Sequence, residues 1–209
     1  VQMLETIKEG GWLMIPIFIS SVVASAIILE RLWSLDAKRI LPKNLLPQVW
    51  VWLKNDQLDS IKLRKLHLSS PLGHILAAGL INYKDGKQAM TQAIERAAAE
   101  TIRDLECYLS TLGIIAAVCP LLGLLGTVIG MIQVFGDIMF GVSAISSNLA
   151  GGISSALITT AAGLVVAIPA YIFHRYFVRK VELLILSLET ESSKLVESIY
   201  SDNTIGVAA

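Results

Sequence analysis

The sequence predicts an all-α membrane protein with three transmembrane helices, the second and third of which extend into a cytoplasmic helical bundle. The chain has 209 residues, of which 54% are hydrophobic and only 16% are charged, so it is more apolar than a soluble domain of this length would be. The charges are also clustered, because the windows 11–29, 109–135 and 149–173 contain no Asp, Glu, Lys or Arg. Each window is close to the ~20 residues that a helix needs to cross the hydrocarbon of a bilayer.

The overall charge gives no reason to expect a nucleic-acid partner, since 17 basic residues balance 17 acidic ones. The apolar excess instead indicates that the environment of the chain is membrane lipid.

The first window, "GGWLMIPIFISSVVASAII", has a secretory signal peptide as its alternative interpretation. It is preceded by "ETIKEGG", which carries acids as well as one lysine, and no small-residue cleavage site follows it. The window runs directly into "LERLWSLDAKR". A retained membrane helix is therefore the expectation.

The orientation follows from the distribution of Lys and Arg, which mark the cytoplasmic side of a membrane protein. Basic residues follow the first span, precede the second and follow the third, whereas the connection "GDIMFGVSAISSN" has none. The predicted parts are a periplasmic N-terminus (1–10), a first transmembrane helix (11–30), a cytoplasmic helical segment (31–106), a second transmembrane helix (107–135), a periplasmic loop (136–148), a third transmembrane helix (149–173) and a cytoplasmic C-terminal helix with its tail (174–209).

The segment 31–106 has little strand character. We expect short helices interrupted at Pro42 and Pro47, and a helix that begins at Pro71 with Ser70 as its N-cap. From about residue 88 apolar side chains recur at helical spacing, with no Gly or Pro before the second span. One helix is therefore predicted over about 88–135, roughly 70 Å long. The third span is expected to continue with an apolar stripe formed by Val181, Leu184, Ile185, Leu188, Leu195 and Ile199.

The second and third spans are rich in small residues, which in lipid allow helices to approach closely. Gly126 and Gly130 form a GxxxG pattern in the second span. Helix-to-helix packing is the general interpretation, and the positions assigned to it are Gly123, Gly126, Gly130 and Gly163, with Pro120 and Pro169 as the residues that free a carbonyl or bend a helix.

A second interpretation gives the hydroxyl groups a role as the lining of an ion path. Ser155 and Thr159 are four residues apart and so share a helix face, with Thr160 beside them and Thr127 in the second span. The alternative is that each hydroxyl only bonds its own helix backbone. No acid, base or histidine lies inside the three windows, although transporters that move protons usually need one. A titrating group would then have to come from another chain.

The sequence offers no enzyme active site, metal site or cofactor motif. Ser154 and Ser155 have no His or Asp within the spans to activate them, which argues against an intramembrane hydrolase. Cys107 and Cys119 are twelve residues apart, about 18 Å on one helix, which is too far for a disulfide. The three histidines, His67, His74 and His174, are interpreted as ordinary surface or interfacial residues.

Two stretches carry a resemblance to a known family. "GLLGTVIGMIQVF" and, after a short loop, "LAGGISSALITTAAGLVVAIPAYIFHRYF" resemble the MotA/TolQ/ExbB proton-channel family, most closely its ExbB branch, and the N-terminal "ETIKEGGWLMIPIFISSVVASAIILERLWSL" also looks like an ExbB beginning. The resemblance covers roughly residues 3–190.

The resemblance implies a homopentamer in the bacterial inner membrane, whose second and third helices surround a dimer of a single-span partner of the ExbD or TolR kind. That partner carries a membrane aspartate, and a TonB-like protein is a further implied partner. Thr127 and Thr160 match pore threonines of the family, whereas Ser155 stands where well-known ExbB and TolQ proteins carry a glutamate.

The function that we expect is therefore the pore-forming subunit of a motor complex driven by the proton-motive force, which energises periplasmic or outer-membrane work such as TonB-dependent transport. The alternatives are a non-conducting oligomeric scaffold for a partner protein, or a Tol- or Mot-type stator subunit.

Overall fold

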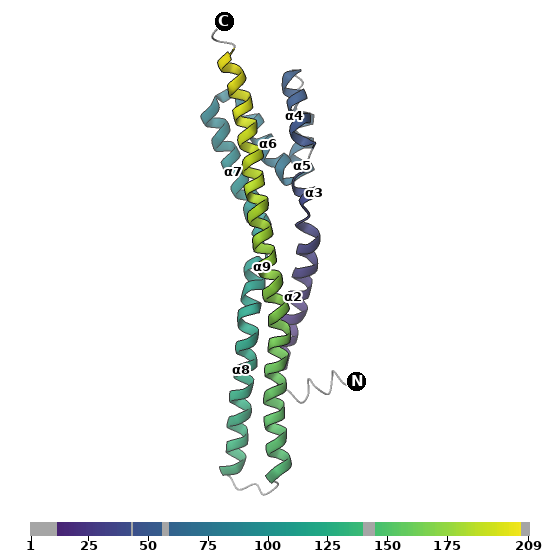
Figure 1. Ribbon diagram of the computed structural model, residues 1–209, viewed down its shortest axis with the longest axis vertical. Coiled ribbons are helices and arrows are strands. Elements are labelled where there is room, and N and C mark those ends of the chain that lie inside the picture. The colour runs from purple at the N-terminus through teal and green to yellow at the C-terminus, as the bar shows by residue number, and fades with distance from the viewer. Residues whose placement is uncertain (1–11, 43, 56–58, 140–144, 206–209) are drawn as a thin grey trace. The chain divides into compact units, whose positions relative to one another are not determined.

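The computed structural model describes residues 12–42, 44–55, 59–139 and 145–205, and within these ranges it contains helices and no strands. The predicted periplasmic N-terminus (1–10) lies outside the described residues, as does the centre of the predicted loop 136–148. The helices are α2 (Met14–Ser34), α3 (Ala37–Ile40), α4 (Leu45–Lys54), α5 (Ser60–Ser69), α6 (Pro71–Ile81), the 3₁₀ turn η1 (Tyr83–Asp85), α7 (Lys87–Glu106), α8 (Leu109–Met139) and α9 (Ile145–Ile205) (Figure 1).

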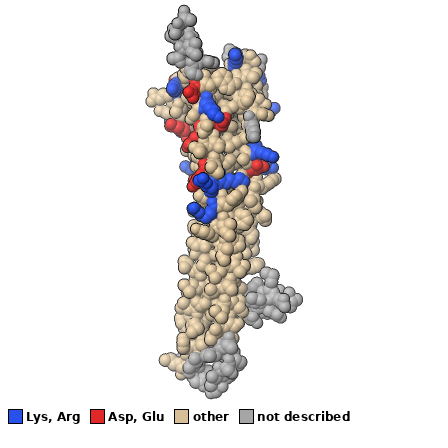
Figure 2. All heavy atoms as spheres, viewed as in Figure 1, with Lys and Arg blue, Asp and Glu red and all other residues tan. Residues whose placement is uncertain are grey.

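Three of these helical stretches are long and apolar enough to cross a membrane, which confirms the predicted all-α membrane fold with three spans. The chain divides into two compact units. The membrane unit consists of residues 1–31 and 108–176, and the polar unit consists of residues 32–107 and 177–209. Figure 2 shows the charged side chains gathered over the polar unit, whereas the visible face of the apolar helices is free of them.

The polar unit has its own apolar core, formed by stripes on α6, α7 and α9. Met90, Ile94, Ala97 and Leu105 of α7 are buried, as the helical spacing predicts. On α9, Val181, Leu184, Leu188, Leu195 and Ile199 are buried, and Ile185 is half-buried. The hydroxyl of Tyr200 donates a hydrogen bond of 3.0 Å to the carbonyl of Tyr83, which ties the C-terminal part of α9 to η1.

The start of α6 agrees with the sequence prediction. Pro71 is its first residue, and the Oγ of Ser70 accepts a hydrogen bond of 3.1 Å from the Gly73 N–H. This is the N-cap geometry, in which a side chain satisfies an amide that has no partner within the helix.

The prediction that Pro47 interrupts a helix is wrong, because Pro47 is the third residue of α4 and the helix continues to Lys54. The first turn of a helix tolerates proline, since the amides there have no partner within the helix. Pro42, by contrast, lies between α3 and α4, as predicted.

The prediction of one unbroken helix over about 88–135 is also wrong. α7 ends at Glu106 and α8 begins at Leu109. Between them Tyr108 has a φ of 61°, a left-handed conformation that stops the helical hydrogen-bond ladder. The third span does continue as predicted, because α9 is one helix of 61 residues.

Candidate ion path along α8 and α9

Glycines bring α8 and α9 into close contact within the membrane unit. A β-carbon built at Gly126 would lie 2.6 Å from Cγ2 of Thr159, and one built at Gly130 would lie 2.9 Å from Cβ of Ala156. One built at Gly123 would lie 3.0 Å from the Cα of Thr160. Distances of this kind leave no room for a side chain, so these three glycines form the face of α8 that contacts α9.

The same contact from the α9 side involves Gly163 and Gly152. A β-carbon at Gly163 would lie 2.5 Å from the carbonyl oxygen of Cys119, and one at Gly152 would lie 2.5 Å from Cγ2 of Val134. Residues later in α8 contact residues earlier in α9. The two helices are therefore antiparallel.

Thr160 connects the two helices by a hydrogen bond. Its Oγ1 donates to the carbonyl of Gly123 over 2.9 Å, while the carbonyl of Ala156 in its own helix lies 3.3 Å away. A hydroxyl has only one proton to donate. The Thr160 oxygen therefore offers its lone pairs, and not a proton, to anything that approaches it.

Thr127 and Thr159 bond their own helices. Thr127 Oγ1 donates to the Leu124 carbonyl over 2.6 Å, and Thr159 Oγ1 donates to the Ser155 carbonyl over 2.9 Å. Their side chains differ in exposure, because Thr159 is 1% exposed against Gly126 and Thr127 is half-buried. Thr159 thus lies within the contact of the two helices, whereas Thr127 lies at its border.

Helical geometry places Thr127 and Thr160 on the same side of the helix pair. Successive residues of an α-helix are about 100° apart around its axis. Each threonine lies about 70° around its own helix from the centre of the face that contacts the other helix. In both helices this rotation is in the direction in which the residue number increases. Because the helices are antiparallel, equal rotations of this kind point both residues toward one side of the pair. Ser155 is rotated by a similar angle in the opposite sense and belongs to the other side.

The two prolines lie inside helices that continue through them. Pro120 is half-buried in α8, and Pro169 is exposed in α9. Each removes one amide donor from its helix, which leaves the carbonyl four residues earlier without that partner.

α2 contributes two further contacts within the membrane unit. The Ser20 hydroxyl lies close to the thiol of Cys119, which is buried. Arg31 is also buried, with its Nε 2.8 Å from Oε2 of Glu30 and its guanidinium carbon 5.4 Å from the centroid of the Tyr108 ring. Arg31 thereby connects the end of α2 with Tyr108, the residue that precedes α8.

His174 of α9 lies against α8. A β-carbon at Gly113 would lie 2.9 Å from Nε2 of His174, so the imidazole packs against the α8 backbone. Among the described residues, no group of three or more His, Cys, Asp or Glu side chains is arranged to hold a metal ion.

These observations define an all-helical membrane protein with three spans, in which two antiparallel helices carry threonines along one side of a glycine-lined contact. Residues 67–190 match the MotA/TolQ/ExbB proton channel family. The chain is 29% identical over 193 residues to the ExbB-like 3 protein of Synechocystis sp., with 91% of each chain covered. It is 32% identical over 185 residues to the ExbB-like 1 protein of the same organism, with 85% of this chain and 71% of the relative covered. A region of 63 residues is 48% identical to the biopolymer transport protein exbB1 of Vibrio cholerae, and covers 30% of this chain and 28% of that protein.

The chain belongs to the MotA/TolQ/ExbB proton channel family, close to ExbB. It is accordingly a multi-pass protein of the inner membrane. The matched region includes the whole α8–α9 contact described above.

Proposed function

We propose that this chain is the pore-forming subunit of a proton-motive-force-driven complex that energises periplasmic or outer-membrane work, such as TonB-dependent transport. Membership of a proton channel family and relatives named ExbB-like support this function. The observation that carries it is that Thr127 and Thr160 lie on one side of the α8–α9 pair, where both hydroxyl oxygens have lone pairs available. The charge-free windows of these two spans contain no acid or base of their own.

The proposed topology has a periplasmic N-terminus and a cytoplasmic C-terminus. It rests on the basic residues that lie next to the spans within residues 31–106 and 174–209. Residues 136–148, which connect the second and third spans, contain no Lys or Arg.

The titrating carboxylate comes from a partner. We expect five copies of this chain to surround a dimer of a single-span protein of the ExbD or TolR kind, whose membrane aspartate faces Thr127 and Thr160. Because both hydroxyl protons are donated to backbone carbonyls, the oxygens accept hydrogen bonds from water or from a protonated carboxyl group. They do not donate to a carboxylate without breaking the bonds that they make here.

Because the two hydroxyl oxygens accept hydrogen bonds and do not donate them, they distinguish a protonated aspartate from a deprotonated one. This difference suggests how proton passage is coupled to rotation of the complex. A protonated aspartate is held beside the threonines, and it leaves once it has lost its proton. Each proton that crosses supplies about 2.3 kcal/mol per 100 mV of membrane potential. Alternate protonation of the two partner aspartates would then turn the pentamer relative to the dimer.

Thr159 and Ser155 have different places in this proposal. Thr159 is a packing residue against Gly126, since it is buried between the helices. Ser155 lies on the opposite side of the pair from Thr127 and Thr160, so it is not part of the path proposed along the threonines.

The test is the pair of variants Thr160→Val and Thr127→Val in the complete complex. Valine keeps the shape of threonine but removes the hydroxyl. We expect energised output to be lost while the complex still assembles, and Thr160→Ser, which keeps the hydroxyl, to retain most of the activity. Full activity of both valine variants would refute the hydroxyl path.

The rival function is a non-conducting oligomeric scaffold, which explains the glycine contacts equally well but needs no hydroxyl. Proton flux through the reconstituted complex distinguishes the two. A Tol- or Mot-type stator subunit would share the conducting mechanism, and the identity of the partner that co-purifies would distinguish it.

A further inference from the structure

The polar unit contains a cavity of about 630 Å³ between α3, α5, α6 and the end of α7. Basic side chains dominate its charged lining. Lys38, Arg39, His67 and His74 line it, and among the described residues that do so the one carboxylate is Asp104. A cavity with this balance of charge favours an anionic occupant.

Three of the basic side chains contact neighbouring rings, whereas Lys38 is exposed. The guanidinium carbon of Arg39 lies 4.6 Å from the centroid of the Trp33 ring, and a guanidinium fixed in this way is suited to bidentate recognition of a phosphate. The rings of His67 and His74 meet edge to face with centroids 4.3 Å apart. Thr101 donates its proton to the Ala97 carbonyl, so its 3.5 Å contact with Nδ1 of His74 makes that nitrogen the donor.

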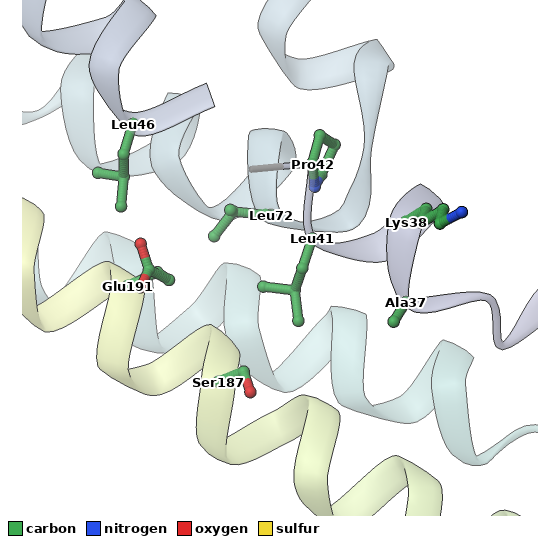
Figure 3. Close-up of a pocket in the computed structure, with 8 residues that line it drawn as sticks. All are labelled: Ala37, Lys38, Leu41, Pro42, Leu46, Leu72, Ser187 and Glu191. Carbon is green, nitrogen blue, oxygen red and sulfur yellow. The ribbon is translucent and has the colours of Figure 1, made fainter. Parts of the chain in front are cut away.

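Lys38 also borders a second cavity of about 650 Å³, which is lined mainly by apolar residues. In Figure 3 the side chain of Lys38 points away from Leu41 and Leu72, which contribute to that apolar lining. Its ammonium group is therefore not directed into the apolar cavity.

Two residues that line the cavity of about 630 Å³ are close in sequence to the charge-free membrane windows. Ser34, the last residue of α2, and Asp104, near the end of α7, both line it. Ser34 is five residues, or about 8 Å along α2, beyond the first charge-free window, and Asp104 is five residues before the second window. The headgroup region of a bilayer extends about 5–8 Å beyond the hydrocarbon on each side.

We propose that this cavity binds the phosphate group of an anionic phospholipid, with Lys38 and Arg39 as its main ligands. Basic pockets at the cytoplasmic ends of membrane helices bind anionic headgroups in this way. The site is separate from the threonines of α8 and α9, and it does not depend on the proposed ion path.

The experiment measures binding of short-chain phosphatidylglycerol, short-chain phosphatidylcholine and inorganic phosphate to the full chain in detergent. We expect phosphatidylglycerol to bind in preference to phosphatidylcholine. The double variant K38Q/R39Q should weaken that binding by about thirtyfold, the loss expected for two basic residues near a membrane surface. The control K65Q/R96Q removes two exposed charges of the same unit that do not line the cavity, and it should bind as the unmodified chain does.

Equal binding of the two lipids, or an equal loss in the control, would overturn the proposal. If inorganic phosphate bound as tightly as the lipid, with the same dependence on Lys38 and Arg39, the claim that the bound phosphate belongs to a phospholipid would be wrong. Thermal unfolding of each variant without ligand shows whether the unit is intact, and K38Q alone replaces the double variant if loss of the Arg39–Trp33 contact unfolds it.

Discussion

The hydroxyl of Thr160 in α9 donates a hydrogen bond of 2.9 Å to the main-chain carbonyl of Gly123 in α8. Gly123 has no side chain, so the backbones of the two helices approach closely enough for this bond to form. One residue therefore serves both helix packing and the orientation of the hydroxyl oxygen toward the proposed ion path.

We expect Thr160→Val to have only a small effect on stability. Hydrogen bonds between membrane helices contribute about 0.6 kcal/mol on average, and the valine fills the same volume. Thermal unfolding of the purified chain should shift by a few degrees at most, with Thr160→Ser unchanged. A large loss of stability in Thr160→Val would mean that any loss of transport reports unfolding and not the missing hydroxyl.

Gly163→Ala should destabilise the α8–α9 pair by about 1–3 kcal/mol, the usual cost of overpacking. Its added β-carbon would lie 2.5 Å from the Cys119 carbonyl, which belongs to the backbone and cannot rotate away. Gly136→Ala is the matched control, because a β-carbon there has nothing within 4 Å. Thermal unfolding in detergent measures both, and equal behaviour of the two variants would contradict the close contact.

The left-handed conformation of Tyr108 predicts that Tyr108→Val is more harmful than Tyr108→Asn. Both changes remove the ring beside Arg31, so that loss is common to the pair. Asparagine tolerates a φ of 61°, whereas a β-branched residue does not. We expect the asparagine variant to be more stable by about 1 kcal/mol, as measured by denaturant or thermal unfolding. If the valine variant were equally stable, α7 and α8 would not need a left-handed residue between them.

Labelling of the two cysteines tests the proposed topology. Cys107 is exposed and precedes the second span, whereas Cys119 is buried beside Ser20. A membrane-impermeant maleimide should label Cys107 in inside-out vesicles and not in intact spheroplasts. Cys107→Ser should abolish labelling and Cys119→Ser should preserve it. Labelling of Cys107 from the periplasmic side would contradict the proposed orientation.

Local sequence patterns predict much of this fold. Charge-free windows predict the three spans because a charge in hydrocarbon is costly, and the buried stripe of α7 follows from helical spacing. The Ser70–Pro71 pair predicts the start of α6 because capping depends on neighbouring residues only.

Features that depend on tertiary structure were not predictable in the same way. Tyr108 gives no compositional signal for a left-handed conformation, so the break between α7 and α8 was not expected. Thr159 and Thr160 are adjacent threonines, and only the rotation of α9 against α8 shows that the first is buried and the second borders the contact. The same rotation separates Ser155 from Thr160, although both were grouped as hydroxyl candidates.

The central claim is that this chain supplies hydroxyls and close packing while a partner supplies the titrating acid. Proton flux into liposomes under an imposed potential tests it most directly. We predict no flux with this chain alone, flux when the single-span partner with its membrane aspartate is present, and loss of that flux in Thr160→Val. Rapid acidification of liposomes that contain only this chain would contradict the account.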